Sequence, residues 1–224
     1  MCIRSRLLRT GILLAAAVLL CVPGIVDYRT EAATANAVVD SKKIALTFDD
    51  GPHPYYTEQL LDGLKEREVR ATFFVMGKNV EQYPELVERM SEEGHLVGNH
   101  TYSHMQLSQS NEDAFREELV KTNEMIEKLT GQEVQYVRPP YGTWDKKFEK
   151  ELNMFPVLWT IDTLDWCSDN VACIVRDVTA KAEENAIILM HDEYKSTVTA
   201  ALQIVDELQE EGYEFVTVDE LLFD

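Results

Sequence analysis

Residues 44–52 run Ile-Ala-Leu-Thr-Phe-Asp-Asp-Gly-Pro, a short apolar segment that ends in two adjacent carboxylates and a turn. The apolar part is typical of a buried β-strand, and Asp-Gly-Pro is typical of the turn that follows one. Two neighbouring carboxylates at a strand end are unfavourable unless a cation lies near. Asp49 and Asp50 therefore belong either to an ordinary turn or to a site with one metal ligand and one general base.

The segments that follow repeat this arrangement of strand and helix. Such alternation favours parallel strands with right-handed crossovers, an α/β fold whose working residues lie at the carboxyl ends of the strands. No internal repeat is visible after the N-terminal segment. The expected strands are 44–48, 71–75, 96–98, 136–137, 155–161, 186–190 and 215–218, and the expected helices are 57–67, 83–93, 112–129, 146–152, 174–184 and 197–211.

Two histidines follow the third expected strand, in the segment His100-Thr-Tyr-Ser-His104. If this segment is helical, both imidazoles lie on one face and can bind one ion; the alternative is an incidental pair. Together with Asp50 they offer two nitrogens and one oxygen, which leaves coordination positions open, as in catalytic rather than structural metal sites. We expect His53 in a solvent-exposed loop and His95 in a structural position.

Three later strand ends are also followed by polar and aromatic groups. Paired prolines after Arg138 fix the backbone and leave the N–H of Tyr141 free to face a ligand. His191 follows an apolar strand, so it is either a core residue or a proton donor that titrates near neutral pH. Each segment has a plain alternative as a rigid or polar loop. The three segments are Arg138-Pro-Pro-Tyr141-Gly, Asp162-Thr-Leu-Asp165-Trp166 and Leu189-Met-His191-Asp.

Taken in order, TFDDGP, HTYSH, RPPYG, DTLDW and LMHD between Thr47 and Asp192 resemble the five motifs of the polysaccharide deacetylase family, the NodB homology domain of carbohydrate esterase family 4. The resemblance covers essentially the whole chain after its N-terminal segment. It implies a distorted, truncated (β/α) barrel of about seven parallel strands. It also implies hydrolysis of N-acetyl groups of a glycan.

The resemblance implies a role for each metal-side residue. Asp50, His100 and His104 would hold a divalent cation, zinc in the first instance, with cobalt and nickel as alternatives. Asp49 would be the general base, and Arg138 would hold that base in place. No motif position departs from the pattern of active members.

The resemblance assigns the substrate side as well. Tyr141 would offer its backbone N–H to the oxyanion, and Trp166 would form part of the substrate groove. Leu189 would line the pocket for the acetyl methyl group. His191 would be the general acid, and Asp165 would tune it.

Composition restricts the partners. The first 35 residues contain four arginines and two acids, so the remaining residues hold 17 basic and 38 acidic groups, a balance of −21. Such a chain repels nucleic acid and anionic lipid head groups. We therefore expect no nucleic-acid partner. The resemblance implies a glycan as the partner, and we expect a monomer.

The N-terminus resembles an export signal. Arg4, Arg6 and Arg9 precede an apolar run over 11–23 that is short for a membrane span, and Ala33-Thr-Ala35 offers a cleavage site. We expect a signal peptide or N-terminal anchor over 1–35 and a catalytic domain over 36–224. An uncleaved segment would be the one contact with a membrane, and either outcome places the domain outside the cytoplasm, secreted or at the cell surface.

Two questions stay open at this stage. Cys167 and Cys173 are expected equally as a disulfide or as two free thiols, because sequence does not show geometry. The substrate is expected to be N-acetylglucosamine of bacterial peptidoglycan. Chitin oligomers and acetylated xylan are alternatives within the same chemistry, and a noncatalytic glycan-binding module is the alternative of another class.

Overall fold

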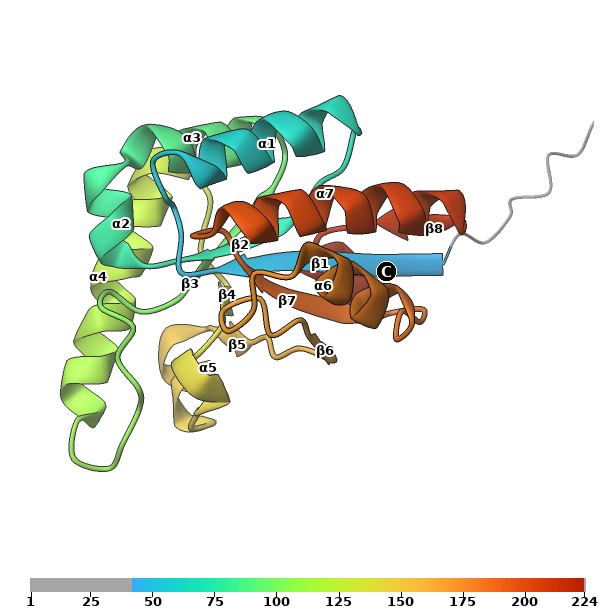
Figure 1. Cartoon of the computed structure of the whole chain (residues 1–224). Coiled ribbons are helices and arrows are strands. Elements are labelled where there is room, and N and C mark those ends of the chain that lie inside the picture. The colour runs from blue at the N-terminus through green and yellow to red at the C-terminus, as the bar shows by residue number, and fades with distance from the viewer. Residues whose placement is uncertain (1–41, 224) are drawn as a thin grey trace, which may run out of the picture. The chain divides into compact units, whose positions relative to one another are not determined.

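A computed structural model of the chain describes residues 42–223, in which parallel strands alternate with helices (Figure 1). The expected signal segment and its cleavage point lie outside these residues. No helix between residues 42 and 223 combines the length and hydrophobicity needed to cross a bilayer. The strands are β1 (Lys42–Asp49), β2 (Thr72–Val75), β3 (Leu96–Asn99), β4 (Tyr136–Val137), β5 (Phe155–Pro156), β6 (Ile161–Asp162), β7 (Ile187–His191) and β8 (Tyr213–Phe215).

The helices occupy the connections between strands, as expected for right-handed crossovers. In Figure 1, α1, α3 and α7 lie above the strands and α5 below them. The helices are α1 (Tyr56–Glu66), α2 (Gly77–Gln82), α3 (Pro84–Glu92), α4 (Glu112–Thr130), α5 (Lys147–Leu152), α6 (Val171–Thr179), α7 (Lys195–Glu210) and α8 (Val218–Phe223), with a 3-10 turn at Pro140–Gly142.

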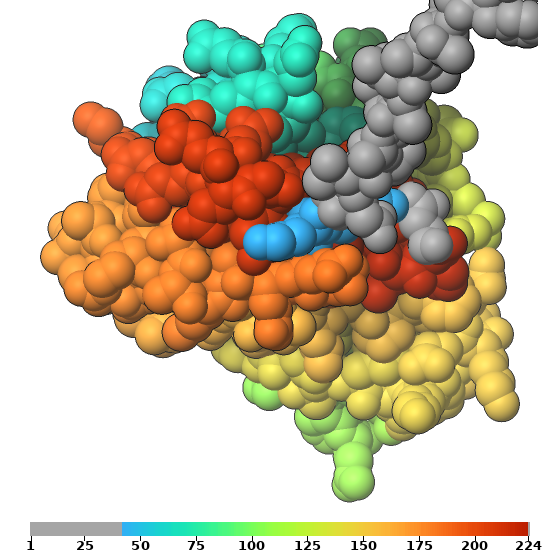
Figure 2. Space-filling model, turned by 90° about the vertical axis from the view of Figure 1, so that its right-hand side faces the viewer, coloured from blue at the N-terminus to red at the C-terminus, as the bar shows by residue number. Residues whose placement is uncertain are grey.

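The sheet has the order β5-β4-β3-β2-β1-β7-β6, with β8 paired to the start of β1, and every pair is parallel. The curled parallel sheet confirms the expected distorted barrel. Figure 2 views the end at which β1 begins, where its blue residues lie between red and orange segments from the C-terminal part of the chain. The carboxyl end of β1, with Asp49, lies at the opposite end of the strand.

The expected single strand over 155–161 is wrong. Its two ends form β5 and β6, which are the two edges of the sheet. Val157 donates its N–H to Val137 on one edge, and Thr160 donates to Ile187 near the other. The run is apolar like a strand, but only Val157 and Ile161 in it are buried. It changes hydrogen-bonding partners midway because it crosses from edge to edge. The segment thereby connects the two edge strands and closes the barrel covalently.

The expected strand over 215–218 is also displaced: β8 ends at Phe215, and α8 begins at Val218. Apolar side chains continue through both elements, so the sequence pattern does not mark the change between them. The short helix α2 was not expected.

Alternation along β1 determines which side chains reach the site. Ile44, Leu46 and Phe48 pack in the main core beneath the helices. Because successive side chains of a strand point to opposite faces, the intervening residues face the interior of the barrel. Thr47 and Asp49 are among them, and both bond to Arg138 inside the barrel.

Candidate active site

The two carboxylates after β1 point in different directions. Asp49, which is 3% exposed, accepts a hydrogen bond from Nη1 of Arg138 at 2.9 Å. Asp50 adopts a left-handed conformation with φ 72°, so its carboxylate turns toward the histidines instead. Its backbone carbonyl accepts a hydrogen bond from Nδ2 of Asn79 at 2.7 Å. The turn thus separates one acid from the other.

The segment from His100 to His104 is a loop, so the expectation of a helix there is wrong. Thr101 and His104 have φ values of 62° and 65°, which interrupt a right-handed helical spiral. The loop is held by its own hydrogen bonds: Thr101 donates to the side chain of Asn99, and Met105 donates to Oγ1 of Thr101. It still brings the two imidazoles together, with ring centroids 4.9 Å apart.

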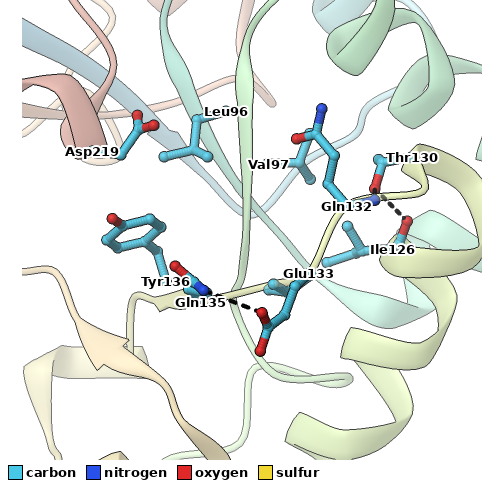
Figure 3. Close-up of a pocket in the computed structure, with 10 residues that line it drawn as sticks. Leu96, Val97, Ile126, Thr130, Gln132, Glu133, Gln135, Tyr136 and Asp219 are labelled. Carbon is cyan, nitrogen blue, oxygen red and sulfur yellow. Dashed lines mark hydrogen bonds between the residues drawn. The ribbon is translucent and has the colours of Figure 1, made fainter.

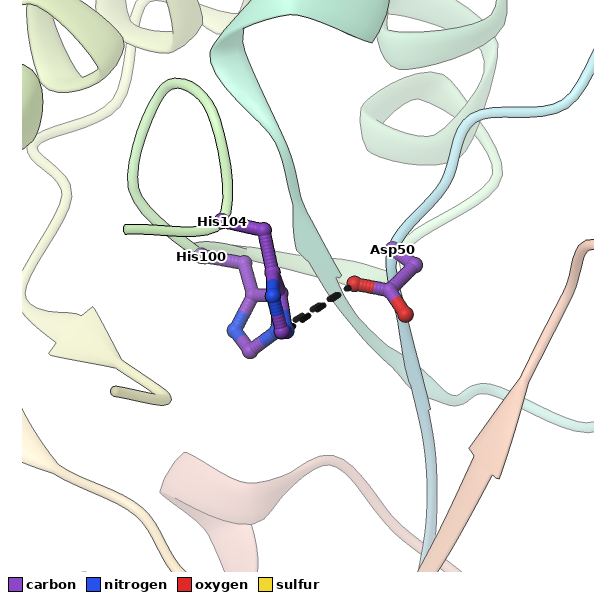
Figure 4. Close-up of side chains that lie close together, drawn as sticks. All are labelled: Asp50, His100 and His104. Carbon is purple, nitrogen blue, oxygen red and sulfur yellow. Dashed lines mark ion pairs between the residues drawn. The ribbon is translucent and has the colours of Figure 1, made fainter. Parts of the chain in front are cut away.

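Asp50, His100 and His104 converge on one point (Figure 4). Oδ1 of Asp50 lies 3.4 Å from Nε2 of His100 and 3.6 Å from Nε2 of His104. The same oxygen is buried and makes no hydrogen bond. Ligands at about 2.1 Å from a tetrahedral zinc ion are separated by roughly 3.4 Å, so the spacing fits a divalent cation.

The orientation of His100 also fits a metal ligand. Its Nδ1 lies 2.5 Å from the carbonyl oxygen of Arg138, which fixes the ring and leaves Nε2 to face Asp50. A backbone or carboxylate acceptor on the second ring nitrogen is usual for histidine ligands. The triad therefore has three donors, one of them oriented from behind, and an open side.

The electrostatics of the triad draw positive charge to this point. Burial would raise the pKa of Asp50, but the neighbouring His100 imidazole and its positive charge outweigh burial and lower the pKa below its ordinary value. Burial tends to lower the pKa of His100, and the charges of Asp49 and Asp50 outweigh it, so that the pKa is raised. Burial and the charge of His100 lower the pKa of His104. The two acids thus favour positive charge at this point.

Arg138 fills the barrel interior beneath these groups. Its side chain is fully buried, and its guanidinium lies 4.4 Å from the ring centre of Phe74. Besides Asp49 it donates to Oγ1 of Thr47 at 2.6 Å and to the carbonyl of Val157 at 3.0 Å. Burial lowers the pKa of Arg138, and the charge of Asp49 opposes that change. The guanidinium thus holds the Asp49 carboxylate from below.

His191 and Asp165 form a second pair on the other side of the triad. Asp49 and His191 are register partners on β1 and β7, so they lie side by side. Nδ1 of His191 lies 2.9 Å from Oδ1 of Asp165, whose other oxygen accepts from the His191 N–H and from Thr197. Burial lowers the pKa of His191. The hydrogen bond and charge of Asp165 together have the larger effect and raise the pKa to about 9. At neutral pH His191 therefore carries a proton.

A pocket of about 480 Å³ opens above these groups. Leu189 lines it and is buried, whereas Tyr141 and Trp166 stand at its mouth with 69% and 55% of their surface exposed. Large exposed aromatic side chains around a pocket are typical of a binding site. Every residue that the sequence places in the site except Arg138 and Asp165 lines this pocket, and those two contact the lining from behind.

Sequence reasoning missed two lining residues, Trp159 and Asp162. Trp159 was hidden in the run assigned to one strand. Asp162 had a signal, because it opens the DTLDW segment at a strand end, but no role was given to it. His95 is buried, as expected, and accepts a hydrogen bond from the Ala71 N–H. His53 is half-buried rather than exposed, because its ring stacks on Tyr56.

Two other features lie apart from this site. Cys167 and Cys173 are free thiols in the structure. A smaller cavity of about 180 Å³ lies where β3 and β4 begin, lined by Leu96, Tyr136 and Asp219 among others (Figure 3). It is lined by no histidine, and it lies at the end of these strands opposite to the site.

Comparisons of sequence and of structure both find relatives that are deacetylases. The sequence profile of the family described as polysaccharide deacetylase matches residues 36–157. The chain is 42% identical over 181 residues to the peptidoglycan-N-acetylglucosamine deacetylase PgdA of Listeria monocytogenes, covering 81% of this chain and 39% of that protein. The chain thus spans about two fifths of that relative's length.

Two further relatives are matched over most of their length. A chitooligosaccharide deacetylase of Rhizobium leguminosarum bv. trifolii is 43% identical, covering 74% of this chain and 78% of that protein. The solved structure of the peptidoglycan deacetylase PdaC from Bacillus subtilis has 41% identity and a TM-score of 0.76, covering 81% of this chain and 90% of that chain.

Proposed function

We propose that this chain, which belongs to the polysaccharide deacetylase family, hydrolyses N-acetyl groups of N-acetylglucosamine units in a glycan. The observation that carries the proposal is the placement of Asp49 and His191. They are paired on adjacent strands, and Asp49 lies 3.8 Å from the same His100 nitrogen that faces Asp50. One carboxylate and one protonated imidazole therefore flank the point where three metal ligands converge.

The metal ligands in this proposal are Asp50, His100 and His104, and the cation is Zn²⁺, which suits two imidazoles and one carboxylate. When bound, the cation polarises the acetyl carbonyl and makes the attacking water more acidic. The remaining chemistry belongs to side chains and backbone of this chain.

Asp49 accepts the proton of the attacking water. Its Oδ1 is engaged by Arg138, which leaves Oδ2 to face the triad. The N–H of Tyr141 makes no hydrogen bond within residues 42–223 and is free to donate to the oxyanion. A single donor of this kind contributes about 3 kcal/mol to transition-state stabilisation.

His191 protonates the departing amine. Because its Nδ1 is engaged by Asp165, its Nε2 carries the proton that is transferred. An amine leaves poorly without protonation, so an imidazole whose pKa is about 9 is well prepared for this step. Acetate and a free amino sugar are the products. A noncatalytic binding module needs neither this acid nor this base.

We propose bacterial peptidoglycan as the substrate, since the PgdA and PdaC relatives are named for it. Chitin oligomers are the second candidate, on the strength of the Rhizobium relative. We also propose export through residues 1–35 and a catalytic domain over 36–224, since the profile match begins at residue 36. The monomeric state stays a prediction.

The test measures acetate released from peptidoglycan, chitin oligomers of several lengths and acetylated xylan. Asp49→Asn should lose activity by about 10²- to 10⁴-fold, the range for a general base, while it still binds zinc. Asp169→Asn is the matched control, because Asp169 is exposed and its carboxylate makes no hydrogen bond within residues 42–223. Full activity of Asp49→Asn, or activity that survives exhaustive metal removal, would contradict the proposal.

A further inference from the structure

Asp50, one of the proposed metal ligands, has an unusual backbone conformation. Its φ of 72° lies in the left-handed region, which costs a residue with a Cβ about 1 kcal/mol or more. Such a conformation persists only where the surroundings enforce it. The groups that contact the Asp50–Gly51 turn therefore decide whether the carboxylate points at His100 and His104.

One side of the turn is held by the start of α2. Nδ2 of Asn79 donates to the carbonyl oxygen of Asp50 at 2.7 Å, and the N–H of Met76 donates to that of Gly51 at 3.0 Å. Two consecutive carbonyl groups are thereby fixed by one short segment. Rotation of the Asp50–Gly51 peptide would break the hydrogen bond to Asn79.

The opposite side is held by a buried carboxyl group. Asp192 is fully buried, and a Cβ built on Gly51 would lie only 2.4 and 2.5 Å from its two carboxyl oxygens. One of these oxygens accepts a hydrogen bond from the Thr57 hydroxyl, which itself accepts from the His53 N–H at 2.7 Å. The other oxygen, Oδ1, has no hydrogen-bond partner. A buried, half-satisfied carboxyl is unfavourable for stability alone.

We propose that Asn79 and Asp192 are positioning residues that clamp the Asp50–Gly51 turn from opposite sides and so set the geometry of the metal site. The inference rests on the proposed metal ligands. The clamp explains why a costly buried carboxyl lies against a glycine next to a metal ligand. Neither residue touches substrate in this scheme; each acts through the direction of the Asp50 carboxylate.

The test measures zinc affinity by calorimetry on folded, metal-free protein. Asn79→Ala removes one hydrogen bond and should weaken zinc binding about two- to tenfold. Gln82→Ala is the matched control, because Gln82 lies on the same helix and donates to the Lys78 carbonyl instead of to Asp50. Asp192→Ala should weaken binding by about tenfold. Asp192→Asn should restore affinity to within twofold of the wild type, because it keeps the shape and an acceptor for Thr57.

Two readouts separate positioning from a merely structural role. Thermal unfolding of the metal-free variants reports stability, and the visible spectrum of the Co²⁺-loaded protein reports ligand geometry. The clamp predicts an altered spectrum for Asn79→Ala and Asp192→Ala, and at saturating metal a lower kcat with KM unchanged. It also predicts a result for the double variant Asn79→Ala/Asp192→Ala. Its loss in free energy of zinc binding should be smaller than the sum of the two single losses, since both residues act on one turn.

Unchanged zinc affinity and an unchanged Co²⁺ spectrum in folded Asn79→Ala and Asp192→Ala would overturn the clamp. A failure of the proposed function is recognised separately. In that case the wild type releases no acetate from any glycan, whereas the affinity differences between variants persist.

Discussion

Asp165→Asn should lower the pKa of His191 by about two units. In the wild type that pKa is about 9, against an ordinary value of 6.5, although burial acts in the other direction. The opposing effect comes first from Asp165, through a 2.9 Å hydrogen bond and its charge. The difference of about 2.5 units corresponds to about 3 kcal/mol. An asparagine keeps the shape but not the charge. Burial is then opposed only by the charges of Asp49 and Asp50, so the pKa falls toward its ordinary value of 6.5.

The consequence for catalysis follows from the fraction of protonated imidazole. At pH 7.5, a pKa of about 9 leaves about 97% of His191 protonated, and a pKa of 6.5 leaves about 9%. Because the proposed general acid must carry a proton and a bound cation lowers the His191 pKa in both proteins, kcat of the metal-loaded variant at this pH should fall well below that of the wild type. The loss should shrink as the pH is lowered.

The sign of the stability effect is also determined. A group whose pKa is raised on folding stabilises the native state fully below its unfolded pKa, here 6.5, and that contribution is lost as the pH rises through the folded value. Wild-type protein should therefore lose about 3 kcal/mol of unfolding free energy between pH 6.5 and pH 9. Asp165→Asn should not show this decline.

The assay is an NMR titration of the five histidines in metal-free protein, since a cation beside Asp50 would itself repel the imidazolium. His191→Gln assigns the resonance. Asp162→Asn is the matched control: its side chain accepts from the Leu164 N–H and does not contact His191. A His191 resonance that still titrates near 9 in Asp165→Asn would refute the reasoning.

Three further substitutions test the packing and strain around the site. Gly51→Ala places a methyl group against the Asp192 carboxyl, 2.4 Å from its nearest oxygen, and should cost about 1–3 kcal/mol in chemical denaturation. Arg138→Met leaves the buried Asp49 carboxylate without its cation and should cost about 3–5 kcal/mol by the same measurement. Leu164→Gly relieves a left-handed conformation with φ 55° at an exposed position and should raise Tm by about 2–4 °C; an unchanged or lower Tm would contradict that account.

Much of the site could be predicted because its residues follow strand ends. Asp49, His100 and His191 come directly after apolar runs, and parallel strands bring their carboxyl ends to one edge. Motif resemblance supplied roles for these residues that spacing alone left open. The sequence therefore predicts the convergence of Asp50 with both histidines, although the helix expected over residues 100–104 is wrong.

What could not be predicted depends on backbone conformation and on contacts distant in sequence. Thr101 and His104 replace a helix with a left-handed loop, and residue type does not reveal that choice. Asp192 accepts a hydrogen bond from Thr57, which lies 135 positions away in the sequence. A local sequence pattern does not predict such a contact. The run over 155–161 misled for a related reason, since apolar composition alone does not show which strand provides the hydrogen-bond partners.

The crossing of the chain from β5 to β6 has a consequence for behaviour at high concentration. Exposed sheet edges invite other polypeptides to add a strand, and proteins avoid this with edges that are short or covered. Here both edges are strands of two residues joined to each other, and β8 adds one of three. Another polypeptide could form very few backbone hydrogen bonds with these short edge strands. The way in which the barrel closes therefore disfavours amyloid-like association.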